Sequence, residues 1–168
     1  MIEFGEMERE ALLKYLDFVM WHYRVVDAFW YLSVEESYDS ETADHFNEKV
    51  WEKAARLAAL KIVKNFEIQE KGLEGFLRAL RYFPWAIMSG YQVEQKPEEL
   101  TLWVPQCPSQ AARLKRDLGE YDCKEMHRGE FTSFAHAIDP RIVVTCVHAP
   151  PDPHPPERFC MWRFTMQG

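Results

Sequence analysis

The sequence predicts an α+β fold, in which a helical layer comes first and a largely antiparallel sheet follows. All ten prolines of the 168 residues lie at or after Pro84, so the first half of the chain can be continuous helix. Hydrophobic residues recur every three or four positions before Pro84 and every second position beyond it. We therefore expect one α+β domain over residues 1–168, with a helical part at 1–83 and a sheet part at 84–168.

The helical part contains three to four predicted helices. Residues 8–38 carry Leu, Val and Met at helical spacing, and a break near 21–23 is the alternative to one long helix. Asp39-Ser40 with Glu41 behind it indicates a new N-cap, and the next helix runs from there towards Phe66. A shorter helix over 73–83 ends before Pro84, because proline lacks the amide that would continue it.

The sheet part contains about four predicted strands and two short inserted helices. The expected strands are 90–96, 100–107, 141–148 and 158–166, and the expected helices are 108–118 and 130–138. The last two strands flank the loop 149–157, which has five prolines in nine positions and cannot itself be sheet. The loop is therefore expected to be stiff and polyproline-like.

Composition and charge exclude several classes of protein. The chain is 47% hydrophobic and 28% charged, which is a globular and not a disordered composition. A net charge of −7 has the wrong sign for a nucleic-acid surface. No apolar run approaches the ~20 residues that cross a bilayer, and the first residues are acidic where a secretory signal would be basic. We expect a cytoplasmic protein that binds neither nucleic acid nor a membrane.

The four cysteines are the first candidates for chemistry. Strand alternation places Cys146 on the face of Ile142 and Val144, and Cys160 on the face of Trp162 and Phe164. If the last two strands pair symmetrically about Pro153, Cys146 lies directly opposite Cys160, with Cβ atoms ~4.5–5.5 Å apart. The same register pairs His148 with Arg158.

Three interpretations of these thiols stay open. In the first interpretation, the reduced cysteines are inert core residues. The absence of a C-x-x-C element from the sequence favours this interpretation. All four can form a thiolate metal site, or Cys146 and Cys160 can form a partial zinc or iron site with His148 or His154. The candidate metal ligands are Cys107, Cys123, Cys146, Cys160 and His148. Structural disulfides are not expected in a reducing compartment.

The proline-rich loop supplies a second candidate site. Asp152 and His154 are a carboxylate and an imidazole on a rigid segment, and could act as a catalytic acid–base pair or orient a metal-bound water. Alternatively both are polar loop residues that face solvent. In the helical part, Trp51 and Arg56 lie within or beside an apolar stripe, as a helix-to-helix contact or as one wall of a ligand pocket.

Several segments resemble one group of prokaryotic proteins. These segments are Val26–Glu36, Asn47–Trp51, Cys107-x-x-Gln110-x-x-Arg113, Gly119–Cys123, Asp139–Ile142, Pro150–Pro155 and Cys160-x-Trp162-x-Phe164. The group is similar to the L-2-amino-thiazoline-4-carboxylic acid hydrolase-like proteins. The resemblance covers nearly the whole chain and implies a cytosolic α+β domain in which the cysteines, the Arg113 helix and the proline-rich loop form one site. The expected ligand-pocket residues are Trp51, Arg56, Arg113 and Trp162.

The sequence thus predicts a cytosolic small-molecule or metal-binding domain with a cysteine-lined pocket. If it is an enzyme, the expected reaction is hydrolysis of a small heterocycle or amide by metal-bound water. Two other function classes stay open. One is a ligand-sensing domain without turnover, and the other is a structural protein with inert thiols whose exposed aromatic surface forms a homodimer. A zinc or iron cofactor is compatible with the sequence, which does not identify either.

Overall fold

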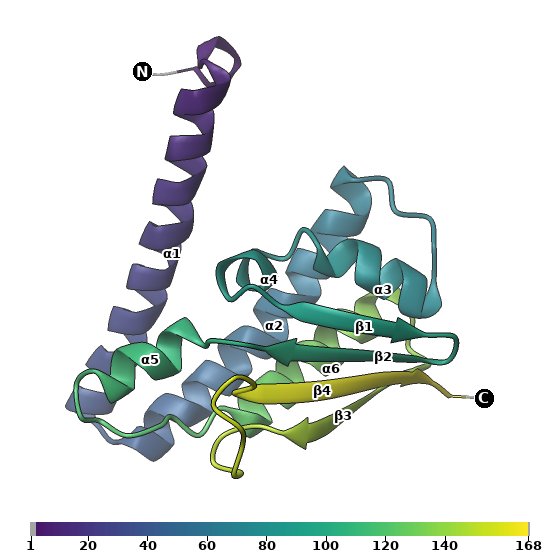
Figure 1. Cartoon of the computed structure of the whole chain (residues 1–168). Coiled ribbons are helices and arrows are strands. Elements are labelled where there is room, and N and C mark those ends of the chain that lie inside the picture. Colours follow the sequence, from purple (N-terminus) through teal and green to yellow (C-terminus); the bar gives the residue numbers. More distant parts are fainter. Residues whose placement is uncertain (1–2, 168) are drawn as a thin grey trace. The chain divides into compact units, whose positions relative to one another are not determined.

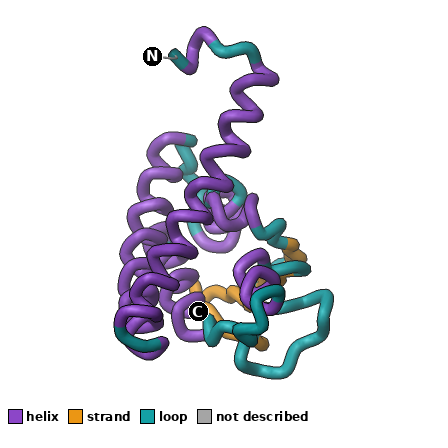
Figure 2. The backbone as a smooth tube through the Cα atoms, turned by 90° about the vertical axis from the view of Figure 1, so that its left-hand side faces the viewer, coloured by secondary structure: helices purple, strands orange, loops and turns teal. Residues whose placement is uncertain are grey.

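The computed structural model describes residues 3–167 and forms two compact units, one ending at Ala43 and one starting at Asp44. All strands of the described residues lie in the second unit. Figure 1 shows the elements in chain order, and Figure 2 separates helix from strand by colour. The fold is α+β, with helices early in the chain and strands late in it, as predicted.

The described part of the first unit contains helices and the short segments between them. It contains a short 3-10 helix, η1 (Phe4–Glu6), and the long helix α1 (Arg9–Ser37), which continues without a break through residues 21–23. Helix α2 (Ser40–Asn65) begins in this unit. The Thr42 amide donates to Asp39 Oδ1 at 2.7 Å, so Asp39 acts as the predicted N-cap.

Four further helices lie in the second unit. Helices α3 (Gly72–Leu80) and α5 (Pro108–Leu114) lie where the sequence predicts them. Helix α4 (Pro84–Met88) was not predicted. Helix α6 (Lys124–Ile138) begins six residues before the predicted start at residue 130. The sequence does not signal this start, because the N-cap residue Cys123 forms no side-chain capping hydrogen bond.

The sheet has four antiparallel strands in the order β1-β2-β4-β3. They are β1 (Gln92–Lys96), β2 (Glu99–Val104), β3 (Ile142–His148) and β4 (Cys160–Met166). The four predicted strands are therefore confirmed. The last strand along the chain, β4, lies between β2 and β3, with a neighbour on each side (Figure 1).

The predicted register of the last hairpin is wrong by two residues. Cys146 pairs with Trp162, and Cys160 pairs across the other edge of β4 with Val104. A bulge between Cys146 and His148 makes the hairpin asymmetric, so His148 pairs with Met161 and not with Arg158. A shift of two keeps each side chain on its face, and the predicted faces are therefore correct.

Helices α2, α3 and α6 cover one face of the sheet and enclose the core of the second unit (Figure 1). Trp162 and Phe164 on β4 are fully buried in this core. The Phe164 ring lies 4.5 Å from Phe76 of α3 and 5.7 Å from Phe131 of α6, between ring centroids. This aromatic contact packs α3 and the middle of α6 against β4.

Among residues 3–167, no helix has both the length and the apolar character needed to cross a bilayer.

Candidate functional site

The N-terminal end of α6 carries a cysteine, a histidine and a glutamate on one helix face. Cys123 immediately precedes the helix, His127 follows one turn later, and Glu130 lies on the next turn. Residues separated by four and then three positions are neighbours on a helix surface. The helix therefore aligns a thiol, an imidazole and a carboxylate in that order.

His127 is hydrogen-bonded to the buried carboxylate. Its Nδ1 lies 2.6 Å from Glu130 Oε2, and the side-chain exposure is 21% for His127 and 1% for Glu130. Burial alone would lower the pKa of His127, but its contacts with the Cys123 thiol and the Glu130 carboxylate raise that pKa well above its ordinary value. The ring is thus held protonated between two acidic groups, and one edge of it reaches solvent.

Gln110 of α5 holds the segment that leads into Cys123. Its side chain forms two hydrogen bonds of 2.8 Å with the backbone of Tyr121, one to the amide and one to the carbonyl. The same Nε2 group lies 3.5 Å from the Cys123 sulfur. The Tyr121 hydroxyl accepts a 2.8 Å hydrogen bond from Asn47 of α2. Gln110 is 1% exposed, so this polar contact is part of the folded core.

Two further thiols surround the pair formed by Cys123 and His127. Cys107 at the start of α5 and Cys160 on β4 both interact electrostatically with Cys123 and His127. Burial raises the pKa of Cys107, and it raises the pKa of Cys160 to about 12. These two thiols are therefore protonated and poorly nucleophilic at neutral pH. Of these three thiols, Cys123 is the one that forms a hydrogen bond with the His127 side chain.

An open cavity of about 750 Å³ lies beside Cys107. Its wall combines the end of α4 with the start of α5 and the end of the proline-rich loop. The lining includes Ile87, Met88, Pro105, Cys107, Ala111 and Glu157. The cavity is mainly apolar and broadly open to solvent. Through Cys107, this wall is linked to the neighbourhood of Cys123.

The five predicted metal ligands do not form one group. Cys107, Cys123 and Cys160 share the environment of His127, whereas Cys146 on β3 interacts with Lys124 and Arg128. His148 Nε2 donates a 2.9 Å hydrogen bond to the Arg158 carbonyl oxygen. Among residues 3–167, no three His, Cys, Asp or Glu side chains are placed to hold a metal ion. Zinc or iron binding stays a prediction without a preformed ligand set in this part of the chain.

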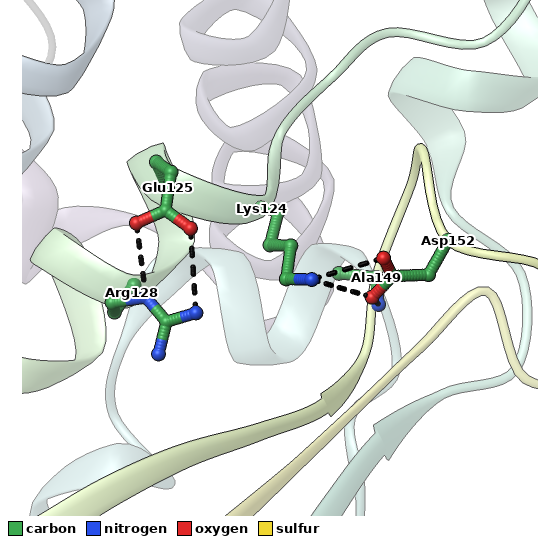
Figure 3. Close-up of polar contacts among 5 residues, drawn as sticks. All are labelled: Lys124, Glu125, Arg128, Ala149 and Asp152. Atoms are coloured by element: carbon green, nitrogen blue, oxygen red, sulfur yellow. Dashed lines mark hydrogen bonds and ion pairs between the residues drawn. The ribbon is translucent and has the colours of Figure 1, made fainter.

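Asp152 and His154 each bind a different partner. Both oxygens of Asp152 accept from Lys124 Nζ, at 2.9 and 2.8 Å, and Oδ2 also accepts from the Ala149 amide at 3.3 Å (Figure 3). The hydrogen bond from Lys124 holds the pKa of Asp152 below its ordinary value. His154 Nε2 lies 3.2 Å from Glu120 Oε1. The contacts of these two residues anchor the proline-rich loop, and their catalytic role stays a prediction.

The four predicted pocket residues lie apart from the cavity. Trp51 is buried and packs edge-on against Trp85, with ring centroids 5.5 Å apart. Trp162 is a core residue, Arg56 is exposed on α2, and the Arg113 guanidinium lies 6.0 Å from the Tyr121 ring centroid. None of the four is among the described residues that line the cavity.

Sequence reasoning missed His127 and Glu130. The signal was the spacing Cys123-x-x-x-His127-x-x-Glu130, which has meaning only if all three residues belong to one helix. The predicted helix started at residue 130, which left His127 outside it.

Comparison with known protein families supplies one assignment. The profile of a family of unknown function, DUF6125, matches residues 5–166, which is nearly the whole chain. The chain belongs to the DUF6125 family. No curated protein matches it. The DUF6125 match carries no link to the L-2-amino-thiazoline-4-carboxylic acid hydrolase-like proteins, so the activity expected from that resemblance stays a proposal.

Proposed function

We propose that this DUF6125 protein is a cytoplasmic hydrolase of a small amide or heterocycle, with Cys123 as its nucleophile. The observation that carries the proposal is the placement of His127 between the Cys123 thiol and the buried Glu130 carboxylate. Nucleophilic catalysis needs a nucleophile, a base in contact with it, and a third group that orients the base. The residues at the start of α6 provide these groups in that order.

The roles follow from the contacts. Glu130 occupies Nδ1 of His127, so Nε2 is the nitrogen left to exchange a proton with the thiol. A thiolate beside an imidazolium is a far stronger nucleophile than a thiol among apolar neighbours. Cys107 and Cys160, whose pKa values are raised by burial, would be bystanders. This replaces metal-bound water, the nucleophile expected from the sequence, with a sulfur atom.

The reaction proceeds in two balanced steps. The Cys123 sulfur attacks the carbonyl or ring carbon and forms a C–S bond, while the C–N bond breaks and the leaving nitrogen takes the proton of His127. Water then attacks the thioester carbon and gives a proton to His127, and the C–S bond breaks to regenerate the thiolate. The only co-reactant is water. All four cysteines are free, and the chemistry requires a compartment that keeps Cys123 reduced.

A small activated ester, p-nitrophenyl acetate, tests this proposal without knowledge of the natural substrate. We expect a burst of about one p-nitrophenolate per chain and an acetyl group on the peptide that contains Cys123. Cys123→Ala should abolish the burst, and His127→Gln should slow it about 100-fold. Cys146→Ala is the matched control and should keep the wild-type rate, since Cys146 lies on β3, where its main charged neighbours are Lys124 and Arg128. Circular dichroism confirms that each variant is folded.

Other results of the same experiment would contradict the proposal. An acetyl group on Cys107, or an undiminished burst in folded Cys123→Ala, would show that Cys123 is not the nucleophile. If no cysteine is acetylated and the thiols resist iodoacetamide in the native state, the protein is a ligand-binding or structural domain, which overturns the proposal.

A further inference from the structure

Helix α1 presents a broad apolar surface. Ten of its large side chains are between 38% and 66% exposed, and none of its residues is fully buried. Leu13 and Trp21 project from other sides of the helix, and we call the remaining eight the α1 face: Tyr15, Leu16, Phe18, Val19, Tyr23, Val26, Phe29 and Trp30. Five of them are aromatic. Exposed aromatic side chains at this density on one helix call for an interaction partner.

The eight residues fall on one side of the helix. With 3.6 residues per turn, they occupy a sector smaller than half of the circumference. Leu16, Val19, Tyr23, Val26 and Trp30 alternate spacings of three and four residues, which is the pattern of a helix-to-helix seam. Neighbouring rings already contact one another along the surface, with 6.3 Å between the centroids of Tyr15 and Phe18.

No charged residue between 11 and 33 falls in this sector. The charged residues of that stretch are Lys14, Asp17, Arg24 and Asp27, and their positions place them on the rest of the circumference. The polar residues within the sector of the α1 face are His22 and Ser33. A charged partner would find nothing to pair with on such a surface, whereas an identical apolar surface is complementary to it.

The exposed area is close to what a stable dimer needs. An aromatic side chain offers ~150–250 Å², so five that are about half exposed leave roughly 400–600 Å² uncovered. With the three aliphatic side chains, the α1 face offers roughly 600–800 Å², against ~800 Å² for each partner in a standard interface. The helix has 29 residues, and at 1.5 Å per residue it is about 44 Å long.

The charge of α1 disfavours a membrane surface. Helices that lie on membranes carry many Lys and Arg residues. Helix α1 carries Arg9, Lys14 and Arg24, which are outnumbered by its acidic residues. Those acidic residues are Glu10, Asp17, Asp27, Glu35 and Glu36. An anionic lipid surface would therefore repel this helix.

We propose that a second copy of this chain binds the α1 face, so that two α1 helices pack against each other in a homodimer. The dimer is independent of the chemistry at Cys123 and goes beyond the proposed function. It turns the aromatic surface of one protomer into the partner surface of the other.

Sedimentation velocity of the full chain over a range of concentrations tests the dimer. We expect dimers for the wild type, and a dissociation constant roughly 100-fold higher for Phe18→Glu and for Trp30→Glu, because each places a charge in an apolar contact. Trp30→Ala is a milder variant that keeps the test decisive should a glutamate variant not fold. Leu118→Glu is the matched control: this leucine is 47% exposed outside α1, and its variant should dimerise as the wild type does.

Two kinds of result would overturn the proposal. One is a monomer at every concentration, or a dimer that all three α1 variants leave unchanged. The other is co-sedimentation with vesicles of phosphatidylcholine and phosphatidylglycerol that Trp30→Glu abolishes, which would assign the α1 face to a lipid surface instead.

Discussion

His127 Nδ1 lies 2.6 Å from Glu130 Oε2, so an exposed imidazole edge is joined to a carboxylate that is 1% exposed. A buried carboxylate is costly unless it is paired. The pair therefore stabilises the start of α6 as well as serving the chemistry proposed for Cys123. The two roles can be separated, because stability and reactivity are measured independently.

The stability supplied by His127 should depend on pH. The fold raises the pKa of His127 above the ordinary value of ~6.5. Its contribution to the free energy of unfolding is therefore complete below about pH 6.5 and declines as the pH rises through the folded-state value. The difference in urea stability between wild type and His127→Gln should shrink from pH 6 towards alkaline pH. His45→Gln, at an exposed histidine of α2, is the control and should show no such trend. A difference that grows with pH would contradict the assigned direction.

Asp139 should be a large contributor to stability. Its side chain is 5% exposed, and it accepts hydrogen bonds from the amides of Gly72 and Arg141 and from the Arg141 guanidinium. Asp139→Ala leaves these donors unsatisfied and should lower the free energy of unfolding by about 2–3 kcal/mol. Urea titration measures this loss, and Asp122→Ala, at an exposed aspartate, should change stability by less than about 0.5 kcal/mol.

The contribution of Asp139 to the free energy of unfolding should be lost in acid. The hydrogen bond from Arg141 holds the pKa of Asp139 far below its ordinary value. Its stabilisation is therefore present above about pH 4 and is lost as the pH falls towards the folded-state value. Wild type should lose stability between pH 4 and pH 2 more steeply than Asp139→Asn. Parallel curves for the two proteins would count against this ionic contribution.

Two glycines should respond oppositely to alanine. A Cβ at Gly75 in α3 would overlap the Glu70 carbonyl oxygen, which is backbone and cannot move aside freely. Gly75→Ala should therefore destabilise the fold by about 1–3 kcal/mol. A Cβ at Gly129 in α6 meets nothing within 4 Å, so Gly129→Ala should stabilise by about 0.5–1 kcal/mol through helix propensity. Thermal melts of both variants provide the comparison, and equal shifts of the same sign would refute the packing at Gly75.

Asp152 should anchor the proline-rich loop and take no part in catalysis. Asp152→Asn weakens the bonds to Lys124 and Ala149, so hydrogen exchange at the Ala149 amide should become faster. Acetylation of Cys123 should be nearly unchanged. Glu125→Gln removes the neighbouring carboxylate that bonds Arg128, and exchange at Ala149 should then stay as in wild type (Figure 3). Loss of Cys123 reactivity in folded Asp152→Asn would contradict this prediction and would show that the proline-rich loop is part of the active site.

The fold followed from signals that are local in sequence. Hydrophobic spacing and the positions of Pro84 and Pro108 located most helices and all four strands. The start of α6 carries no such signal, because Cys123 caps the helix without a side-chain hydrogen bond. The site was missed for the same reason, since the helix is what brings His127 and Glu130 to Cys123.

The hairpin register depends on interactions that a sequence pattern does not contain. Alternation correctly assigned Cys146 and Trp162 to the buried face, because it reports only which side of the sheet a residue occupies. The pairing partner depends on the shape of the connecting loop and on the bulge before His148, and alternation reports neither of them.

The central place of β4 has a consequence for synthesis of the chain. Because β4 bonds to both β2 and β3, neither of those strands can complete its ladder until residues 160–166 have left the ribosome. Until then Leu100, Leu102 and Ile142 lack the apolar surface that covers them in the finished fold. Premature termination shortly before Cys160 would therefore release a polypeptide with unmatched strand edges, which chaperones and proteases recognise.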